Sequence, residues 1–529
     1  MDGSGREFAM NWRHYLFLFL LGLLANGVIA SFQDLPGYID ADYYFVGGTR
    51  LIKGEGFSDP YIWNYIDNPA GLPHPSFTYW NPLASFVAAL GMLLARRTTY
   101  TAGRLGFILI AACIPPLTGA LAHSMTRNNL LSLVSGLLCV FPFFFAPFLP
   151  VPDNYGIFML LGAMFLLLVF RRERWIRFVL GLISGLMTLA RSDGMLWLGL
   201  AGLSLLWNHE NDSPQALLTR IKKAVSPGVL LLLGYLLIMA PWYYRNWITF
   251  GALMAPGSAG LLWLQDYSDI FAYPFDRNSF SAFVRAGWQA ALGDRLGALQ
   301  LNSLNFIFLQ NGLVLFPFIA IGLWQIRHDY RTRLAVMGWL ILFFVMTFVY
   351  PFAGLRGSFF HASAAFQTLW WVAAPLGVDA LFLGRRERGD FDENYHVIAQ
   401  GVLVALAVIV TLYLVHDRVI KNGWPRDDQM YSSVNRILIE NGINQDDIAI
   451  VRNPPGYYLI TGRSAIMVPT GDESTLFAVA QRFQASFLVL EETRLYEKYL
   501  HIYQNPDSDP HFIYLGETDG GEKVFRISK

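Results

Sequence analysis

Two acidic residues, Asp40 and Asp42, follow directly on the first long apolar run, in the stretch "QDLPGYIDADYYFVGG" (33–48). A charge beside lipid is costly, so acids at this place favour a functional role over that of an ordinary solvated charge. Two carboxyl groups separated by one residue can divide the roles of base and stabiliser, or can share a metal ion. Aromatic residues that begin with Tyr43 follow at once, which is typical of a site that holds a ring or a lipid.

A third acid, Asp153, lies in the turn "FLPVPDNYG" (148–156) between two apolar runs. An acid at membrane depth costs about 2.5–3.5 kcal/mol on insertion scales, which suggests function. The alternative is an N-cap of a helix that begins at Asn154, and the two roles are compatible. His74 stands between two prolines that fix its backbone, so its ring could orient a phosphate or assist a carboxylate. A simple hydrogen-bonding role is the alternative for His74.

Three arginines mark the ends of apolar runs: Arg191, Arg245 and Arg356, the last with His361 close by. A guanidinium at such a place can extend to the lipid headgroups, or it can clamp a phosphate with paired donors. Asp193 follows Arg191 after one residue, so a local salt bridge is an alternative there.

The other candidate substrate-binding residues are aromatic. Tyr79 and Trp80 begin an apolar segment, where aromatic side chains are typical of the headgroup boundary. Tyr43 follows the first pair of acids and completes this group.

The apolar runs that position these side chains place the chain in the class of multi-pass membrane proteins. Of its 529 residues 54% are hydrophobic and 15% charged, against about 25% charged in an ordinary soluble protein. Twelve runs approach the length of about 20 residues that crosses a bilayer. They cover residues 15–31, 79–95, 103–122, 130–148, 154–170, 176–190, 194–207, 227–247, 304–326, 334–351, 359–383 and 397–416.

The segment 79–95 decides the topology. If it spans the membrane, the basic clusters at 171–174, 222–223, 327–333 and 385–388 all fall outside, against the positive-inside rule. If it lies in the interface, these clusters are cytoplasmic, and Asp153 is outside. We therefore expect eleven spans in the cell (inner) membrane, a cytoplasmic N-terminus and an extracytoplasmic C-terminus; an ordinary bundle of twelve spans is the alternative.

The parts expected outside are a first loop (31–101), a large loop (247–302) and the tail after His416. Short alternating strands and helix-like stretches in the tail predict a small α/β domain over 421–529, after a transmembrane domain over 1–420. The tail lacks a glycine-rich phosphate loop, so no nucleotide cofactor is expected. A docking or acceptor-positioning role and a purely structural role are equally open. Both cysteines lie in apolar runs and indicate no disulfide or zinc site. The net charge is zero, and no nucleic-acid partner is expected.

Several stretches together resemble the GT-C glycosyltransferases, a superfamily of membrane enzymes. They are "DADYYFVGGTRLIKGEGF" (40–57), "HPSFTYWNPLASFVAAL" (74–90), the helix–acid–helix unit over 128–168, "GLISGLMTLARSDGMLWL" (181–198) and "APWYYRNWITFG" (240–251). The resemblance covers most of the chain with short motifs. It implies juxtamembrane helices in the first outer loop and transfer of a sugar from a polyprenyl-phosphate donor to a lipid, glycan or protein acceptor.

The resemblance also implies roles for the acids. The first-loop acid of the family corresponds to Asp40, with Asp42 as its neighbour, and the acid of the helix–acid–helix unit corresponds to Asp153. Many relatives have two adjacent acids where this chain has Asp40-Ala41, so either aspartate could be the base. A divalent cation, Mg²⁺ or Mn²⁺, is an open possibility, with Asp42 and Asp153 as its candidate ligands. The competing functions are a component of a lipid-linked glycan flippase or carrier, and a glycan ligase or polymerase at the same face.

Overall fold

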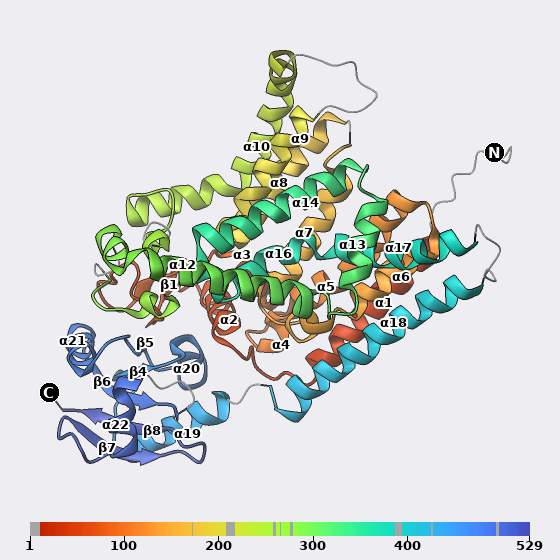
Figure 1. Ribbon diagram of the computed structural model, residues 1–529. Coiled ribbons are helices and arrows are strands. Elements are labelled where there is room, and N and C mark those ends of the chain that lie inside the picture. Colours follow the sequence, from red (N-terminus) through yellow and green to blue (C-terminus); the bar gives the residue numbers. More distant parts are fainter. Residues whose placement is uncertain are drawn as a thin grey trace.

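The computed structural model describes residues 11–171, 173–207, 217–257, 261–264, 266–275, 279–386, 394–424, 427–492 and 497–528. Arg172, Glu387 and Arg388, which belong to two of the basic clusters, lie outside these residues. The structure is a large helical part followed by a small C-terminal part that contains a β-sheet (Figure 1). The all-helical membrane fold with a C-terminal α/β region, expected from the sequence, is therefore present.

Long apolar runs form the helices of the large part, because a helix satisfies all backbone hydrogen bonds where water is absent. Among the described residues, five helices are long and apolar enough to cross a membrane. They cover Trp12–Ala30, Tyr100–Thr126, Leu218–Phe250, Tyr330–Val349 and Tyr395–Lys421. The chain is thus a multi-pass membrane protein, and the expected total of eleven spans stays a prediction.

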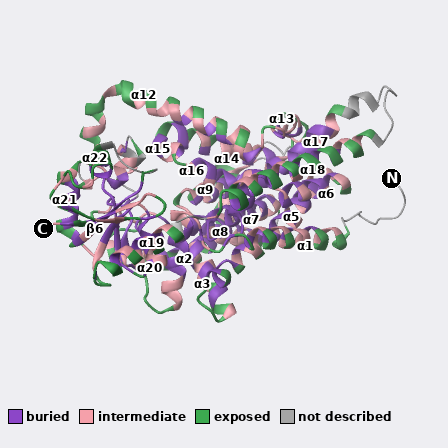
Figure 2. Cartoon of the chain, turned by 90° about the horizontal axis from the view of Figure 1, so that it is seen from below, coloured by how far each residue is buried: buried purple, intermediate pink, exposed green. Residues whose placement is uncertain are grey.

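The large part contains both these long helices and shorter ones. They include α5 (Leu105–Thr126), α6 (Asn129–Val140), α7 (Asn154–Leu168), α8 (Arg174–Ala190), α9 (Met195–Leu206), α10 (Leu217–Phe250), α12 (Phe280–Leu304), α13 (Phe316–Gln325), α14 (Tyr330–Phe344), α15 (Pro351–Leu355), α16 (Ser358–Ser363), α17 (Gln367–Arg386) and α18 (Asn394–Val415), besides α1 (Trp12–Ala30). Buried residues concentrate on α5, α7 and α8 at the centre, whereas α1 and α12 carry many exposed residues (Figure 2).

The first loop (31–101), which is expected outside, contains two helices that pack side by side, α2 (Ile39–Ile52) and α3 (Leu83–Ala95). A Cβ atom at Gly48 of α2 would lie 2.9 Å from the carbonyl oxygen of Ser85, so glycine is needed for this close approach. At 1.5 Å per residue, α3 is about 20 Å long, too short for a bilayer core of about 30 Å. The length agrees with the expected interfacial helix. A short antiparallel pair, β1 (Ser58–Asp59) with β3 (His74–Pro75), lies in the same loop.

The C-terminal part contains a six-stranded sheet in the described residues, with the order β2-β5-β4-β6-β8-β7. Its strands are β2 (Tyr61–Ile62), β4 (Ile448–Val451), β5 (Ala465–Met467), β6 (Ala485–Leu490), β7 (Phe512–Glu517) and β8 (Lys523–Ile527). Helices α19 (Asp427–Glu440), α20 (Pro454–Thr461), α21 (Glu473–Phe483) and α22 (Leu500–Gln504) accompany them. The four strands expected in the tail are β4 to β7, and β8 is an addition.

The edge strand β2 belongs to the first outer loop, not to the tail. Tyr61 pairs with Ala465, and Ile62 with Ile466, in parallel register. Nearby, the Tyr65 hydroxyl donates a hydrogen bond to the carbonyl oxygen of Met467. The sheet therefore joins two segments that are about 400 residues apart in the sequence, across the expected boundary near residue 421.

One glycine sets the spacing between α7 and the turn that follows α16. Gly162 of α7 packs on the turn Ala364–Phe366, which follows α16, and a Cβ atom there would lie 2.0 Å from the carbonyl oxygen of Ala365. Because α7 begins after Asp153 and α16 contains His361, this contact brings those two residues together.

We expect Gly162→Ala to lower the thermal unfolding temperature of the purified protein, because overpacking costs about 1–3 kcal/mol. Gly199→Ala is the matched control, since Gly199 is an exposed residue of α9 with nothing within 4 Å of the added carbon. Alanine favours a helix over glycine by up to about 1 kcal/mol, so the control should be neutral or slightly more stable. Equal unfolding temperatures for the two variants would contradict the role of Gly162.

Candidate functional site

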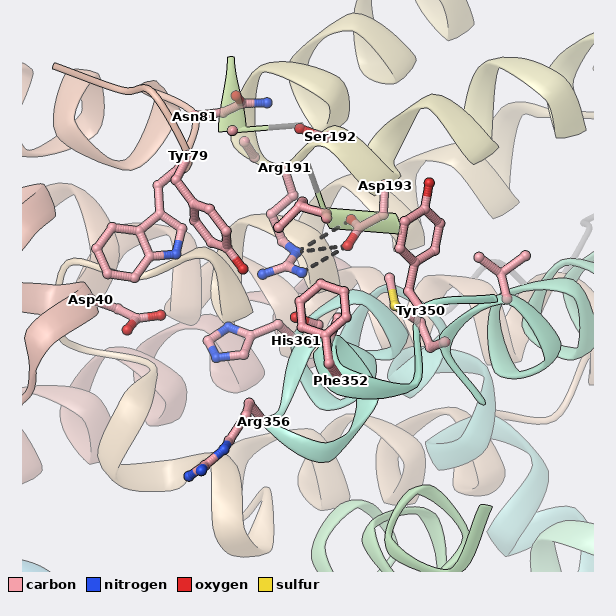
Figure 3. A pocket seen from close by; sticks show the side chains of 18 of the residues that line it. Asp40, Tyr79, Asn81, Arg191, Ser192, Asp193, Tyr350, Phe352, Arg356 and His361 are labelled. Carbon is pink, nitrogen blue, oxygen red and sulfur yellow. Dashed lines mark hydrogen bonds and ion pairs between the residues drawn. The ribbon is translucent and has the colours of Figure 1, made fainter. Parts of the chain in front are cut away.

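Two neighbouring cavities share three lining residues, Asp40, Arg356 and His361. We call the first the acid–arginine cavity, and its volume is about 380 Å³. Besides the shared residues, its lining includes Tyr79, Asn81, Arg191, Asp193 and Tyr350. We call the second the aromatic cavity; it has a volume of about 780 Å³, and Tyr38, Phe144, Phe148, Phe360, Arg418 and Trp424 also line it. The shared residues come from α2 and from the segment around α16. Asp40 and His361 point toward each other, and the Arg356 side chain extends away from them (Figure 3).

Asp40 lies in the first turn of α2, after Tyr38, whose extended backbone begins the helix. Its side chain is only partly exposed, and burial raises the pKa of its carboxyl group above the ordinary value. The negative charge of Asp153 raises this pKa further, whereas the positive charge of Arg191 lowers it. Asp40 thus has the properties of a base: it faces a cavity and holds a proton more tightly than an exposed carboxylate does.

Asp153 is the N-cap of α7, as one reading of the sequence expects. One carboxylate oxygen accepts a hydrogen bond from the backbone N–H of Asn154 at 2.5 Å, and the other accepts one from the Tyr38 hydroxyl. Burial raises the pKa of Asp153, and these two hydrogen bonds lower it. Both oxygens of Asp153 thus have partners, and its negative charge raises the pKa of Asp40.

His361 connects this acid to the cavities. Its Nδ1 lies 3.6 Å from Asp153 Oδ1, which is longer than a hydrogen bond. Its Nε2 shares a hydrogen bond of 2.7 Å with the Tyr155 hydroxyl, and the two rings stack with centroids 4.0 Å apart. The imidazole is therefore held at a fixed angle where both cavities meet.

Arg191 is the C-cap residue of α8, and its side chain points into the acid–arginine cavity (Figure 3). Its Nη2 lies 2.7 Å and its Nε 3.1 Å from Oδ2 of Asp193, so the expected local salt bridge is present. The salt bridge orients the guanidinium without removing it from the cavity wall. Tyr79 and Trp80 line the same cavity, and Trp80 stacks on Trp63 with centroids 3.9 Å apart.

Five of the proposed site residues do not line either cavity: Asp153, described above, and four residues of other surroundings. Asp42 accepts a hydrogen bond from Asn453, the Tyr43 hydroxyl accepts one from the N–H of Phe77, and His74 Nε2 lies 2.9 Å from an oxygen of Asp67. Arg245 donates to the carbonyl oxygen of Ser76 at 2.6 Å and lies over the rings of Trp242 and Phe250. These four side chains make contacts within the first loop or between it and neighbouring elements.

Asp42 and Asp153, the candidate metal ligands, have different hydrogen-bond partners. Successive residues of a helix are about 100° apart, so Asp42 points some 200° away from Asp40 around the helix axis. Asp42 binds Asn453, whereas Asp153 binds Tyr38 and the N–H of Asn154. Among the described residues, no group of three or more histidine, cysteine or acidic side chains could hold a metal. The donor set there does not fit a resident divalent cation.

Sequence reasoning missed residues that the structure places at the site. Tyr38 and Tyr155 bind the central acid and histidine, and they look like any aromatic residues beside an interface. Arg418 lines the aromatic cavity, with its guanidinium carbon 4.8 Å from the Phe144 ring centre and 5.0 Å from that of Phe148. Its place just after the last apolar run was the one signal that could have identified it.

No protein-family model matches the chain, and no curated protein sequence matches it. Solved structures do. ArnT from Cupriavidus metallidurans bound to undecaprenyl phosphate superposes with a TM-score of 0.55, at 13% identity, over 97% of each chain. The archaeal oligosaccharyltransferase AglB from Archaeoglobus fulgidus, in complex with an inhibitory peptide and a dolichol-phosphate, gives a TM-score of 0.51 at 13% identity. That match covers 97% of this chain and 74% of AglB.

The chain has the GT-C fold. The helices of the first loop and the C-terminal α/β region, both expected from the resemblance, are present in the chain. In the GT-C fold of this chain, α2 supplies Asp40 to a position where two cavities meet.

The donor set of the described residues predicts that divalent cations do not stabilise the protein. A site with a Kd of about 10 μM would gain about 2.7 kcal/mol at about 1 mM ion. We expect no such rise in unfolding temperature when Mg²⁺ or Mn²⁺ is added to chelator-treated protein, and the same result for Asp153→Asn. A cation-dependent rise in the parent protein that Asp153→Asn abolishes would contradict this prediction.

Proposed function

We propose that the protein is a glycosyltransferase that moves a hexose or pentose from a polyprenyl-phosphate donor to an acceptor at the outer face of the membrane. The observation that carries the proposal is the meeting of two cavities at Asp40, Arg356 and His361. The aromatic cavity adds the rings of Phe144, Phe148 and Phe360 and the cation Arg418. The acid–arginine cavity adds Arg191 and Asp193 among apolar side chains. A transferase needs this combination, since an amphiphilic donor and a hydroxyl-bearing acceptor must meet at one base.

The aromatic cavity suits the phosphate end of a prenyl lipid. Phe144, Phe148 and Phe360 offer apolar contact, and Arg418 stands over two of these rings as a cation for the phosphate. A guanidinium can bind a phosphate with paired donors. The two neighbours with this fold support the assignment, because one is bound to undecaprenyl phosphate and the other to a dolichol-phosphate.

The acid–arginine cavity then holds the sugar and the acceptor hydroxyl. In the transfer, the acceptor oxygen bonds to the anomeric carbon, the bond from that carbon to the phosphate oxygen breaks, and its electron pair leaves on the phosphate. Asp40 takes the proton of the acceptor hydroxyl, a role in which a well-placed base contributes about 10²–10⁴-fold. Arg356 and Arg418 stabilise the charge that develops on the departing phosphate. The acceptor is a lipid, a glycan or a protein.

The proposed orientation of the protein in the membrane is based on the charged residues at the two ends of α7 and α8. Asp153 and Arg191 stand at the ends near the cavities, and Arg171 and Arg174 stand at the opposite ends. Basic residues favour the cytoplasm, so the cavities face outward from an inner membrane and the C-terminal part lies on their side.

Replacing the base tests this proposal. Asp40→Asn should lower the release of polyprenyl phosphate from a radiolabelled polyprenyl-phosphate sugar by at least about 100-fold, because the amide cannot accept the proton. Purified protein in proteoliposomes would be assayed with undecaprenyl and dolichyl donors, with membrane extract as the acceptor source. Asp34→Asn, at an exposed acid of the same loop, is the matched control and should keep its activity. Full turnover by Asp40→Asn, or movement of intact donor across the bilayer without release, would contradict the proposal.

The pH dependence of kcat/KM provides an independent test. Since only the ionised carboxylate of Asp40 accepts a proton, activity should fall as the pH drops through its raised pKa, well above the ordinary aspartate value of about 3.9. Asp153→Asn removes a negative neighbour, so it should lower this pKa and move the acidic limb of the profile to lower pH. Asp193→Asn, which alters the arginine pair instead, is the comparison variant. An acidic limb that does not move in Asp153→Asn would refute the coupling.

A further inference from the structure

Helix α2 presents its two aspartates to different partners. Asp40 faces the cavities, and Asp42, about 200° further around the helix, faces the C-terminal part. There Asn453 Nδ2 donates a hydrogen bond to Asp42 Oδ2 at 2.8 Å. Asp42 and Asn453 are 5% and 2% exposed, so water does not compete for this charge-assisted hydrogen bond.

Asn453 is itself fixed on both sides. It is the N-cap of α20, with its side-chain oxygen accepting from the N–H of Gly456 at 3.1 Å, and its own N–H lies 3.2 Å from the Tyr431 hydroxyl. Pro454 and Pro455 follow it, and proline is well suited to the first turn of a helix. The amide therefore has one orientation, with its NH₂ group towards α2 (its oxygen is used by the cap).

Gly456 allows this approach. A Cβ atom at this position would lie 2.4 Å from Asn453 Nδ2 and 2.8 Å from Asp42 Oδ2. Any side chain would thus separate the two helices at their contact. The stretch "NPPG" (453–456) does not resemble a nucleotide-binding loop, and its role in the structure is to contact the first turn of α2.

We propose that Asn453 is a positioning residue for the transfer reaction: through Asp42, the C-terminal part fixes the first turn of α2 and so sets the direction of Asp40. This inference rests on the proposed function. It makes the C-terminal α/β region a part of the site instead of a separate docking module. The pairing of β2 with β5 supports it, because the same region also holds the segment that follows α2.

A charge exchange between the two positions tests the inference. Asn453→Asp places a carboxylate against Asp42 at 2.8 Å, and the repulsion should displace the helix turn. Since a misplacement of about 1 Å can cost about 100-fold in rate, we expect kcat to fall by about 10–100-fold with little change in the donor KM. The double variant Asp42→Asn with Asn453→Asp restores one donor and one acceptor, with the cap of α20 intact, and should recover activity to within about threefold.

Hydrogen exchange of the amides of residues 39–52 supplies a readout that does not depend on activity. Exchange should be faster in Asn453→Asp and normal again in the double variant. Asn441→Asp makes the same chemical change at an exposed asparagine of the same region and should leave both readouts unaltered.

Three outcomes overturn the inference: an unchanged kcat in Asn453→Asp, a fall in kcat that the double variant does not recover, or unchanged exchange of α2. A parent protein that transfers no sugar, while exchange in α2 still responds as expected, would instead reject the proposed function and leave the contact established.

Discussion

The site depends on keeping two carboxylates close together in partly dry surroundings. Asp40 and Asp153 repel each other, and burial adds to the cost of their charges. The Tyr38 hydroxyl, the N-terminus of α7 and the guanidinium of Arg191 offset that cost. In the function proposed above, this gives a division of roles: Asp153, with its fixed partners, provides the field, and Asp40, which faces the cavities, takes up and releases the proton. The same logic gives neighbouring carboxylates different roles in other enzymes.

Part of this arrangement could be read from the sequence. The apolar runs and basic clusters predicted a multi-pass membrane protein, and their places at run ends identified Asp40, Asp153 and Arg191 as candidate site residues. The short α3 helix and the tail strands followed from length and alternation. These features depend on local patterns, which a single sequence displays.

The remainder depends on contacts between distant segments. Asp42 and Asp40 look equivalent in the sequence. In the structure they point to different sides of α2, and Asn453, more than 400 residues away, binds Asp42. His74 and Arg245 have site-like residue types, yet they pair with Asp67 and the Ser76 carbonyl behind the cavities. Tertiary pairing of this kind leaves no trace in the spacing of residues.

The two-residue strand β2 has a consequence for how the protein is made. Tyr61 and Ile62 are synthesised early, whereas β5, to which they pair, is completed about 400 residues later. Pairing at such a sequence separation carries a high loop-closure entropy and slows folding. During biogenesis the first loop must therefore stay soluble until α18 has been inserted and β5 has been synthesised. The polypeptide matures as one unit, and a nascent chain that stops before the tail leaves the loop without its final support.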